Sequence, residues 1–106
     1  MIIIKNPTKV KDTFDMAMER TGIDQQMDKC VEEMAELTQG IMKARSMGVA
    51  FSHNVFEEMA HVRLSLDLLE YWLPDNSDRI SKIYNKRIDD WYEFERRLDP
   101  KAGDHS

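Results

Sequence analysis

Two groups of acidic side chains recur at helical spacing near the middle of the chain and could bind a metal ion. The first is Glu32, Glu33 and Glu36, and the second is Glu58 with His61 three residues later. At 100° per residue, Glu33 borders the apolar stripe of its helix and Glu36 is its i+3 neighbour, so both carboxylates can converge on one point. Glu58 and His61 lie on the shoulder of the next apolar stripe, whereas Glu32 points away from its stripe.

Carboxylates that lean toward a core need a partner, because an unpaired buried charge costs several kcal/mol. Three or four carboxylates from two facing helices make a site of hard oxygen ligands, which suits Mg²⁺ or Mn²⁺. Mg²⁺ retains water molecules and completes its coordination with substrate phosphates, so such a site could bind the polyphosphate of a nucleotide. A spare glutamate could then activate water for attack on phosphorus.

A run of cations follows in the last third of the chain. Positions 79 to 88 contain no acidic residue and four basic ones: Arg79, Lys82, Lys86 and Arg87. Lys82 and Lys86 share one helix face, where they could neutralise phosphate charge. Arg87 falls inside the apolar stripe. An arginine there is either paired with a buried carboxylate, for which Glu58 is a candidate, or held ready for an anion.

Four helices are expected to position these groups, since proline, glycine and capping residues mark their ends. The sequence predicts a first helix over 7–21, capped by Asn6, and a second from the cap Asp24 to about 46–48. A third helix is predicted from a cap at Ser52 or Asn54 to Pro74, and a fourth from a cap at 75–77 to Leu98. No stretch has the period-two alternation of a convincing strand. Short connections favour an all-α, four-helix antiparallel bundle. We expect one domain over 1–98 and a polar, disordered tail over 99–106.

Composition excludes several classes of protein. The 106 residues include 15 Lys and Arg against 20 Asp and Glu, a formal net charge of -5 that argues against nucleic-acid binding. Cys30 is the only cysteine, so an internal disulfide and a multi-cysteine zinc site are excluded. There is no Gly-rich phosphate loop and no nucleophile elbow. The sequence has no membrane span of ~20 apolar residues and no signal-peptide core, so we expect a cytoplasmic protein without a membrane partner.

The third expected helix carries apolar side chains on two faces. Its main stripe includes Val55, Met59, Val62, Leu66 and Leu69. On the opposite side lie Leu64, Leu68, Tyr71 and Trp72. A helix with a second apolar face favours oligomerisation, which would cover that face.

Together the motifs resemble the MazG-like family of all-α nucleoside triphosphate pyrophosphohydrolases. The family pattern is Glu-Glu-x-x-Glu on one helix and Glu-x-x-Asp on the next, and here Glu32-Glu33-x-x-Glu36 is followed by Glu58-x-x-His61. The run from Lys82 to Arg87 resembles the cationic helix that follows these motifs in the family. Helix order and spacing agree over residues 8–90.

The resemblance implies Mg²⁺-dependent cleavage between the α- and β-phosphates of a nucleotide, giving a monophosphate and pyrophosphate. By position, Glu33, Glu36 and Glu58 would bind the metal, and Glu32 would hold or activate water. Members are dimers or tetramers, so a homodimer or homotetramer is implied. The residues implied to bind phosphate or nucleoside are Lys82, Asn85, Lys86 and Arg87.

His61 departs from the family pattern, which has Asp at this position. Imidazole is a poorer Mg²⁺ ligand than carboxylate and favours Mn²⁺ or Zn²⁺. We expect His61 to act as a metal ligand in an enzyme with weak activity or altered metal preference. Two alternatives stay open: a catalytically degenerate helical dimer that binds nucleotides or a partner protein, and acidic clusters that serve only as salt-bridge partners.

Overall fold

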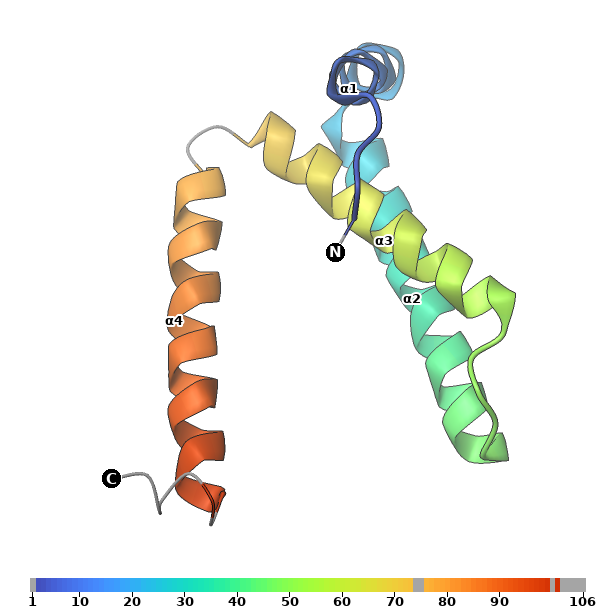
Figure 1. The fold of residues 1–106 in the computed structure, drawn as a ribbon. Coiled ribbons are helices and arrows are strands. Elements are labelled where there is room, and N and C mark those ends of the chain that lie inside the picture. The colour runs from blue at the N-terminus through green and yellow to red at the C-terminus, as the bar shows by residue number, and fades with distance from the viewer. Residues whose placement is uncertain (1, 74–75, 100, 102–106) are drawn as a thin grey trace. The chain divides into compact units, whose positions relative to one another are not determined.

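The computed structural model describes residues 2–73, 76–99 and 101. Over these residues the chain is all-α, with no strand, as predicted. The four helices are α1 (Pro7–Thr21), α2 (Ile23–Met47), α3 (His53–Trp72) and α4 (Asn76–Leu98) (Figure 1). Of the tail predicted over 99–106, the structure describes only residues 99 and 101, so its predicted disorder lies outside the described residues.

The helices belong to two compact units, Met1–Trp72 and Leu73–Ser106, each of which is described by itself. The first unit contains α1, α2 and α3, and the second contains α4. A four-helix bundle and a single domain over 1–98 therefore stay predictions. No helix in the described parts of the chain is long and apolar enough to cross a membrane.

The ends of α1 and α2 follow largely from residue types that the sequence makes visible. The side chain of Asn6 accepts a hydrogen bond from the backbone N–H of Lys9 at 3.0 Å, and a proline occupies the first turn of α1. Gly22, at φ 83°, ends α1, and α2 begins at the next residue. Asp24 was the expected cap of α2 but lies inside its first turn, where its charge favours the helix dipole. Gly48 ends α2 in the left-handed conformation.

The core of the first unit lies where α2 and α3 run side by side, joined by residues 48–52 (Figure 1). A β-carbon at Gly40 of α2 would meet Cγ2 of Val55 on α3 at 3.0 Å. The two helices therefore approach closely at this point, because only a glycine leaves room for the valine methyl group. The buried apolar side chains are Phe14, Cys30, Ala44, Val55, Val62 and Leu68.

The apolar faces of α3 differ from those predicted. Leu68, placed on the outer face by periodicity, is buried, whereas Leu66, placed in the core, is 48% exposed. Near the end of α3, one residue of the predicted outer face contacts α1. Tyr71 lies 5.8 Å from the ring of Phe14 and donates a hydrogen bond to Asp15 at 2.9 Å. Part of the surface predicted for oligomer contact is therefore used inside the first unit.

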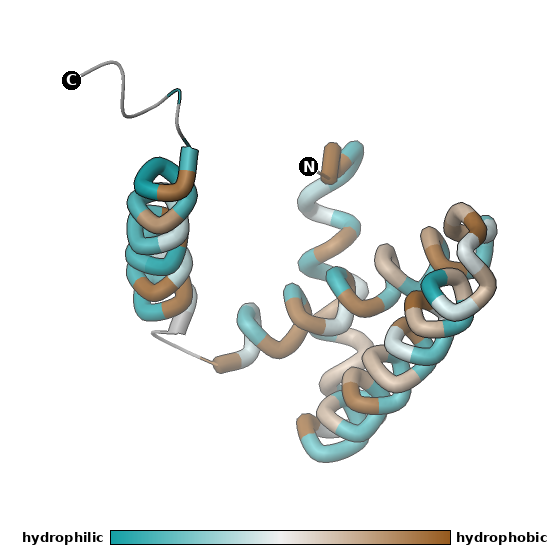
Figure 2. The backbone as a smooth tube through the Cα atoms, turned by 90° about the horizontal axis from the view of Figure 1, so that it is seen from below, coloured by the Kyte–Doolittle hydropathy of each residue, from teal (hydrophilic) through white to brown (hydrophobic). Residues whose placement is uncertain are grey.

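Helix α4 makes up nearly all of the second unit that the structure describes. Its sequence is amphipathic, so hydrophobic and hydrophilic segments alternate along the tube in Figure 2. The large apolar side chains of α4 are exposed, among them Trp91 and Phe94. The guanidinium of Arg87 lies over the ring of Trp91, 5.7 Å from its centre.

Candidate metal centre

Three of the predicted site residues come together between α2 and α3. Glu33 extends from α2, and Glu58 and His61 extend from α3. One potential ligand atom from each side chain lies within 4.8 Å of the other two. Nδ1 of His61 is 3.4 Å from Oε2 of Glu33 and 3.8 Å from Oε2 of Glu58. The expected convergence of these side chains is present, and their role as metal ligands stays a prediction.

Helix packing explains why Glu33 lies inside rather than at the border of the apolar stripe. The line of α2 that faces α3 includes Cys30, Glu33, Gly40 and Ala44, at spacings typical of a helix seam. Gly40 and Ala44 are small, so α3 packs closely there, and this line is buried in preference to the larger methionines. Glu33 is 6% exposed, whereas Met34 in the predicted stripe is 40% exposed.

Each of the two glutamates has one buried oxygen without a hydrogen-bond partner. Oε1 of Glu33 forms an ion pair with Nζ of Lys29 at 3.0 Å. Oε2 of Glu33 and Oε2 of Glu58 are buried and accept no hydrogen bond from the described residues. Buried polar atoms are nearly always satisfied, so two orphaned oxygens beside each other indicate a missing proton or cation.

The two carboxyls have opposite pKa shifts. The hydrogen bond that a protonated Glu58 would donate to Glu33 is the largest cause that raises the pKa of Glu58 to about 7, and burial and Glu36 add to it. Accepting that same bond is the largest cause that lowers the pKa of Glu33, followed by the hydrogen bond from Lys29. Two close carboxyls that cannot both ionise share one proton. A proton shared by the two carboxyls would therefore occupy the place that a cation could take.

The distances in this cluster suit one divalent cation. Around an octahedral ion with bonds of ~2.1 Å, neighbouring ligand atoms are ~3.0 Å apart and opposite ones ~4.2 Å apart. The distances of 3.4 and 3.8 Å from His61 to Glu33 and Glu58 lie between these two values, so the side chains would move by less than about 1 Å to coordinate one ion. Two carboxylates and one imidazole form a mixed oxygen and nitrogen set, which Mn²⁺ and Zn²⁺ accept more readily than Mg²⁺ does.

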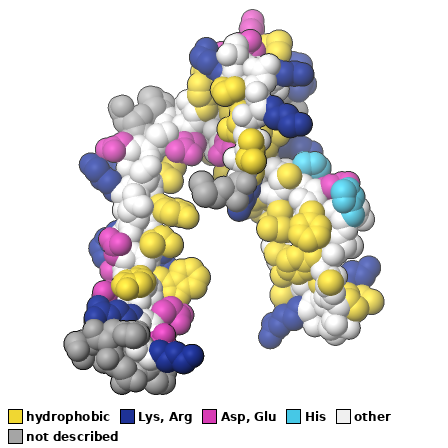
Figure 3. Space-filling view, viewed as in Figure 1, with side chains coloured by type: hydrophobic (Ala, Val, Ile, Leu, Met, Phe, Trp, Pro, Cys, Tyr) yellow, Lys and Arg dark blue, Asp and Glu magenta, His cyan; other side chains and the backbone are white. Residues whose placement is uncertain are grey.

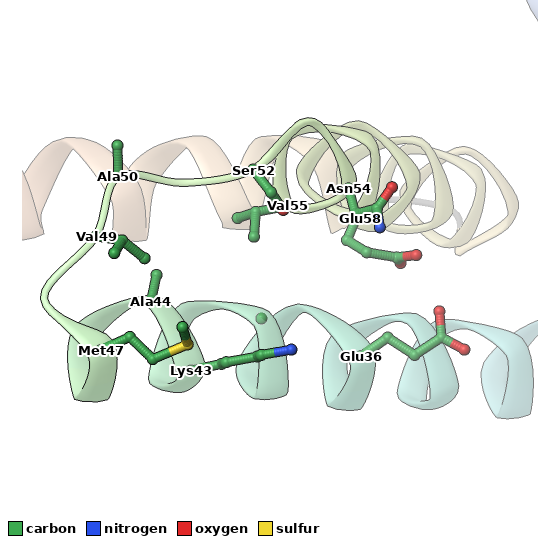
Figure 4. A pocket seen from close by; sticks show the side chains of 11 residues that line it. Glu36, Lys43, Ala44, Met47, Val49, Ala50, Ser52, Asn54, Val55 and Glu58 are labelled. Carbon is green, nitrogen blue, oxygen red and sulfur yellow. The ribbon is translucent and has the colours of Figure 1, made fainter.

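A cavity of about 530 Å³ adjoins the cluster between α2 and α3. Glu36 and Glu58 lie at one part of its wall, and both carboxylates lie in the gap between the helices (Figure 4). Lys43 supplies a cationic side chain to the wall, while Met47 and Val49 are among its apolar members. Glu36 is thus next to the three-residue cluster, on the side that opens toward the cavity.

The other predicted site residues lie elsewhere. Glu32 is exposed, as its angular position predicted, and its role in activating water stays a prediction. The four predicted phosphate-binding residues belong to α4 in the second unit and are all exposed. Lys82 forms an ion pair with Asp78 at 3.1 Å, and Lys86 forms one with Asp90 at 2.8 Å, both within α4. The other two predicted phosphate-binding residues are Asn85 and Arg87.

Two cations near the site were missed from the sequence. Lys29 precedes Glu33 by four residues, and this spacing alone indicates an ion pair on a helix. Lys43 follows Glu36 by seven residues, which places both on one side of α2. Helical periodicity could therefore have identified both residues.

Comparisons with known proteins do not assign the chain to a family. No family model matches the sequence, and no match was found among curated proteins or among solved structures. The chemistry of the Glu33, Glu58 and His61 cluster and the spacing of the motifs are therefore what carry a functional proposal.

Proposed function

We propose that the chain is a metal-dependent pyrophosphohydrolase, which cleaves ribo- or deoxyribonucleoside triphosphates or related nucleotides to the monophosphate and pyrophosphate. The observation that carries this proposal is the pair of buried, unpartnered oxygens of Glu33 and Glu58 beside Nδ1 of His61. Two such oxygens are costly unless a positive charge lies between them. A divalent cation would satisfy both, and divalent cations are the usual partners of nucleotide polyphosphates.

Glu33, Glu58 and His61 would hold the cation, and Glu36 is placed to join them from the cavity side. When bound, the cation would neutralise phosphate charge and act as a Lewis acid. Lys29 holds Oε1 of Glu33, which leaves Oε2 directed at the other two ligands.

The cavity beside the cluster would receive the rest of the substrate. Its wall combines the cation of Lys43 with apolar side chains such as Val49 and Val55. A cationic group suits a phosphate, and an apolar surface suits the face of a base or sugar. A volume of about 530 Å³ falls in the range typical of small-molecule sites.

The resemblance to MazG-like enzymes supports the same activity. The family pattern accounts for the spacing of the four glutamates at positions 32, 33, 36 and 58. His61 is the one residue that departs from it, since the pattern has Asp there. Mg²⁺ remains the first cofactor to test, and Mn²⁺ is favoured by the imidazole. An antiparallel bundle of all four helices, a homodimer or homotetramer, and a cytoplasmic location are part of this proposal.

A hydrolysis screen tests the proposal. Ribo- and deoxyribonucleoside triphosphates are incubated with the chain and either Mg²⁺ or Mn²⁺, and pyrophosphate release is measured. We expect Glu33→Gln and Glu58→Gln to abolish release while far-UV circular dichroism stays unchanged. Glu57→Gln is the matched control, because Glu57 is adjacent but exposed and paired with His53 at 2.9 Å. Release at the parent rate by both site variants would exclude this assignment.

His61 favours one second candidate, a catalytically degenerate protein that binds nucleotides without cleaving them. The imidazole removes one negative charge from the position that the family pattern gives to Asp. Calorimetric titration with Mn²⁺ and a non-hydrolysable triphosphate separates the two candidates when it is run beside the pyrophosphate assay. Binding without any pyrophosphate release from the natural triphosphates would favour the second.

A further inference from the structure

Lys43 is a cation of the first unit that lies in a stretch of chain without acidic residues. Residues 37–56 contain no Asp or Glu, although the chain has 20 of them. The residues three and four positions from Lys43 on α2 are uncharged: Gln39, Gly40, Ser46 and Met47. No acidic side chain of α2 can therefore pair with Lys43 at helical spacing. On the face shown in Figure 3, hydrophobic and basic side chains gather at the end of this unit where α2 is joined to α3.

The side chain of Lys43 belongs to the cavity beside the cluster, together with that of Glu36. Side chains on a helix lean toward its N-terminus, which for Lys43 is the direction of Glu36. Figure 4 shows this orientation, with the amino group extended along α2 toward the glutamate. Arg45 is two residues away and points about 200° around the helix from Lys43, so it lies outside the cavity wall. Of these two cations of α2, Lys43 is the one that can meet a molecule in the cavity.

The groups of α2 that line the cavity follow a fixed order along the helix axis. Glu36 comes first, Lys43 follows about 10 Å further along, and Met47 lies one turn beyond Lys43. Next to Met47 the wall is apolar and includes Val49 and Ala50 (Figure 4). A molecule that fills the cavity lengthwise would therefore meet carboxylates, then a cation, and then an apolar surface.

We propose that Lys43 binds the α-phosphate of the nucleotide, which is the phosphate attached to the nucleoside. This inference rests on the proposed function, because it takes a cation held by Glu33, Glu58 and His61 as the anchor of the polyphosphate. The nucleoside suits the apolar end of the cavity, where its base can be buried. The phosphate next to the nucleoside then lies between that end and the cluster, and this is the position of Lys43.

This position of Lys43 distinguishes the two products of the proposed reaction. Cleavage between the α- and β-phosphates consumes one water molecule and leaves the α-phosphate on the monophosphate. The β- and γ-phosphates leave as pyrophosphate. Lys43 would thus contact the monophosphate and not the pyrophosphate. A lysine that acted only through the charge of the metal site would instead affect the binding of both products alike.

Calorimetric titration with each product in the presence of Mn²⁺ tests this assignment. The probes are pyrophosphate and the common deoxynucleoside monophosphates. Lys43→Met removes the charge and should weaken monophosphate binding about 10-fold, because a hydrogen bond to a charged group is lost, while pyrophosphate binding stays unchanged. Lys43→Arg keeps the charge and should retain most of the affinity. Arg45→Met is the matched control, since it removes a cation of the same helix outside the cavity wall.

The salt dependence of binding separates a direct phosphate contact from a structural role. Monophosphate binding by the parent should weaken as salt is added, and Lys43→Met should show a smaller change. Three results would overturn the assignment: a parent that binds no monophosphate, parent-like monophosphate binding by Lys43→Met, or a loss of pyrophosphate binding as large as that of the monophosphate.

The assay of pyrophosphate release tests the proposed function separately. A parent that releases pyrophosphate while Lys43→Met binds monophosphate normally would leave the hydrolase proposal intact and refute the role of Lys43. A parent that binds monophosphate through Lys43 but cleaves no triphosphate would exclude the hydrolase and retain Lys43 as the phosphate-binding residue of a nucleotide-binding protein.

Discussion

At the proposed metal site, a proton shared by Glu33 and Glu58 would make cation binding depend on pH, and the size of the effect follows from the pKa of Glu58. Hydrogen bonding to Glu33 raises the pKa of Glu58 to about 7, so below that pH a proton competes with the cation. At pH 6 about ten in eleven pairs hold the proton, and at pH 8 about one in eleven does. The apparent affinity for Mn²⁺ should therefore rise about ten-fold from pH 6 to pH 8 and level off above pH 8.

Calorimetric titration in buffers of different ionisation enthalpy measures both the affinity and the protons released. About 0.9 proton should leave the pair on Mn²⁺ binding at pH 6 and about 0.1 at pH 8. Histidine can also change charge in this range, so His61→Asn is titrated beside the parent to remove the imidazole from the count. The asparagine variant should bind more weakly but keep the rise with pH.

Glu58→Gln is the decisive variant, because it removes the titrating carboxyl at nearly constant volume. Mutation of a residue that only holds a metal ligand in place weakens metal binding about 10- to 100-fold. Loss of a ligand itself should therefore weaken Mn²⁺ binding by more than ~100-fold. The remaining weak binding should no longer release a proton. An affinity that is flat from pH 6 to pH 8 in His61→Asn, or parent-like binding by Glu58→Gln, would refute the shared-proton account.

Two further predictions concern charge near the cluster. His61→Asp should raise Mg²⁺-supported pyrophosphate release relative to Mn²⁺-supported release, because carboxylate is the better Mg²⁺ ligand; an unchanged ratio would show that His61 does not set the metal preference. Lys29→Met should tighten Mn²⁺ binding several-fold at pH 8, because it removes a positive charge 3.0 Å from Glu33, and weaker binding in a titration would instead show that the ion pair is needed to orient the carboxylate.

Much of the local structure could be predicted because its signals act over a few residues. Asn6 caps its helix, and glycines at positions 22 and 48 end theirs, because these residue types satisfy backbone requirements at helix ends. Glu58 and His61 had to share a side of α3, since they are three residues apart. The approach of Glu33 to them followed from the apolar stripes of two consecutive helices.

Features that depend on which helices meet could not be obtained from periodicity alone. Hydrophobic periodicity predicted that α2 would bury its methionines. The structure instead buries the line of small residues that includes Gly40, because these residues let α3 pack closely. Leu68 was assigned to the outer face although it is buried, because periodicity within one helix does not reveal which of its sides other elements contact.

The close approach at Gly40 would influence the proposed metal site without touching any of its candidate ligands. The glycine sits on the same line of α2 as Glu33, two turns further along, and Val55 stands one turn before Glu58 on α3. A β-carbon at this position would press on Val55, so the size of this one residue bears on how far apart the two carboxylate-bearing helices stand. Exchanging it would alter the spacing of the proposed site while every candidate ligand is kept.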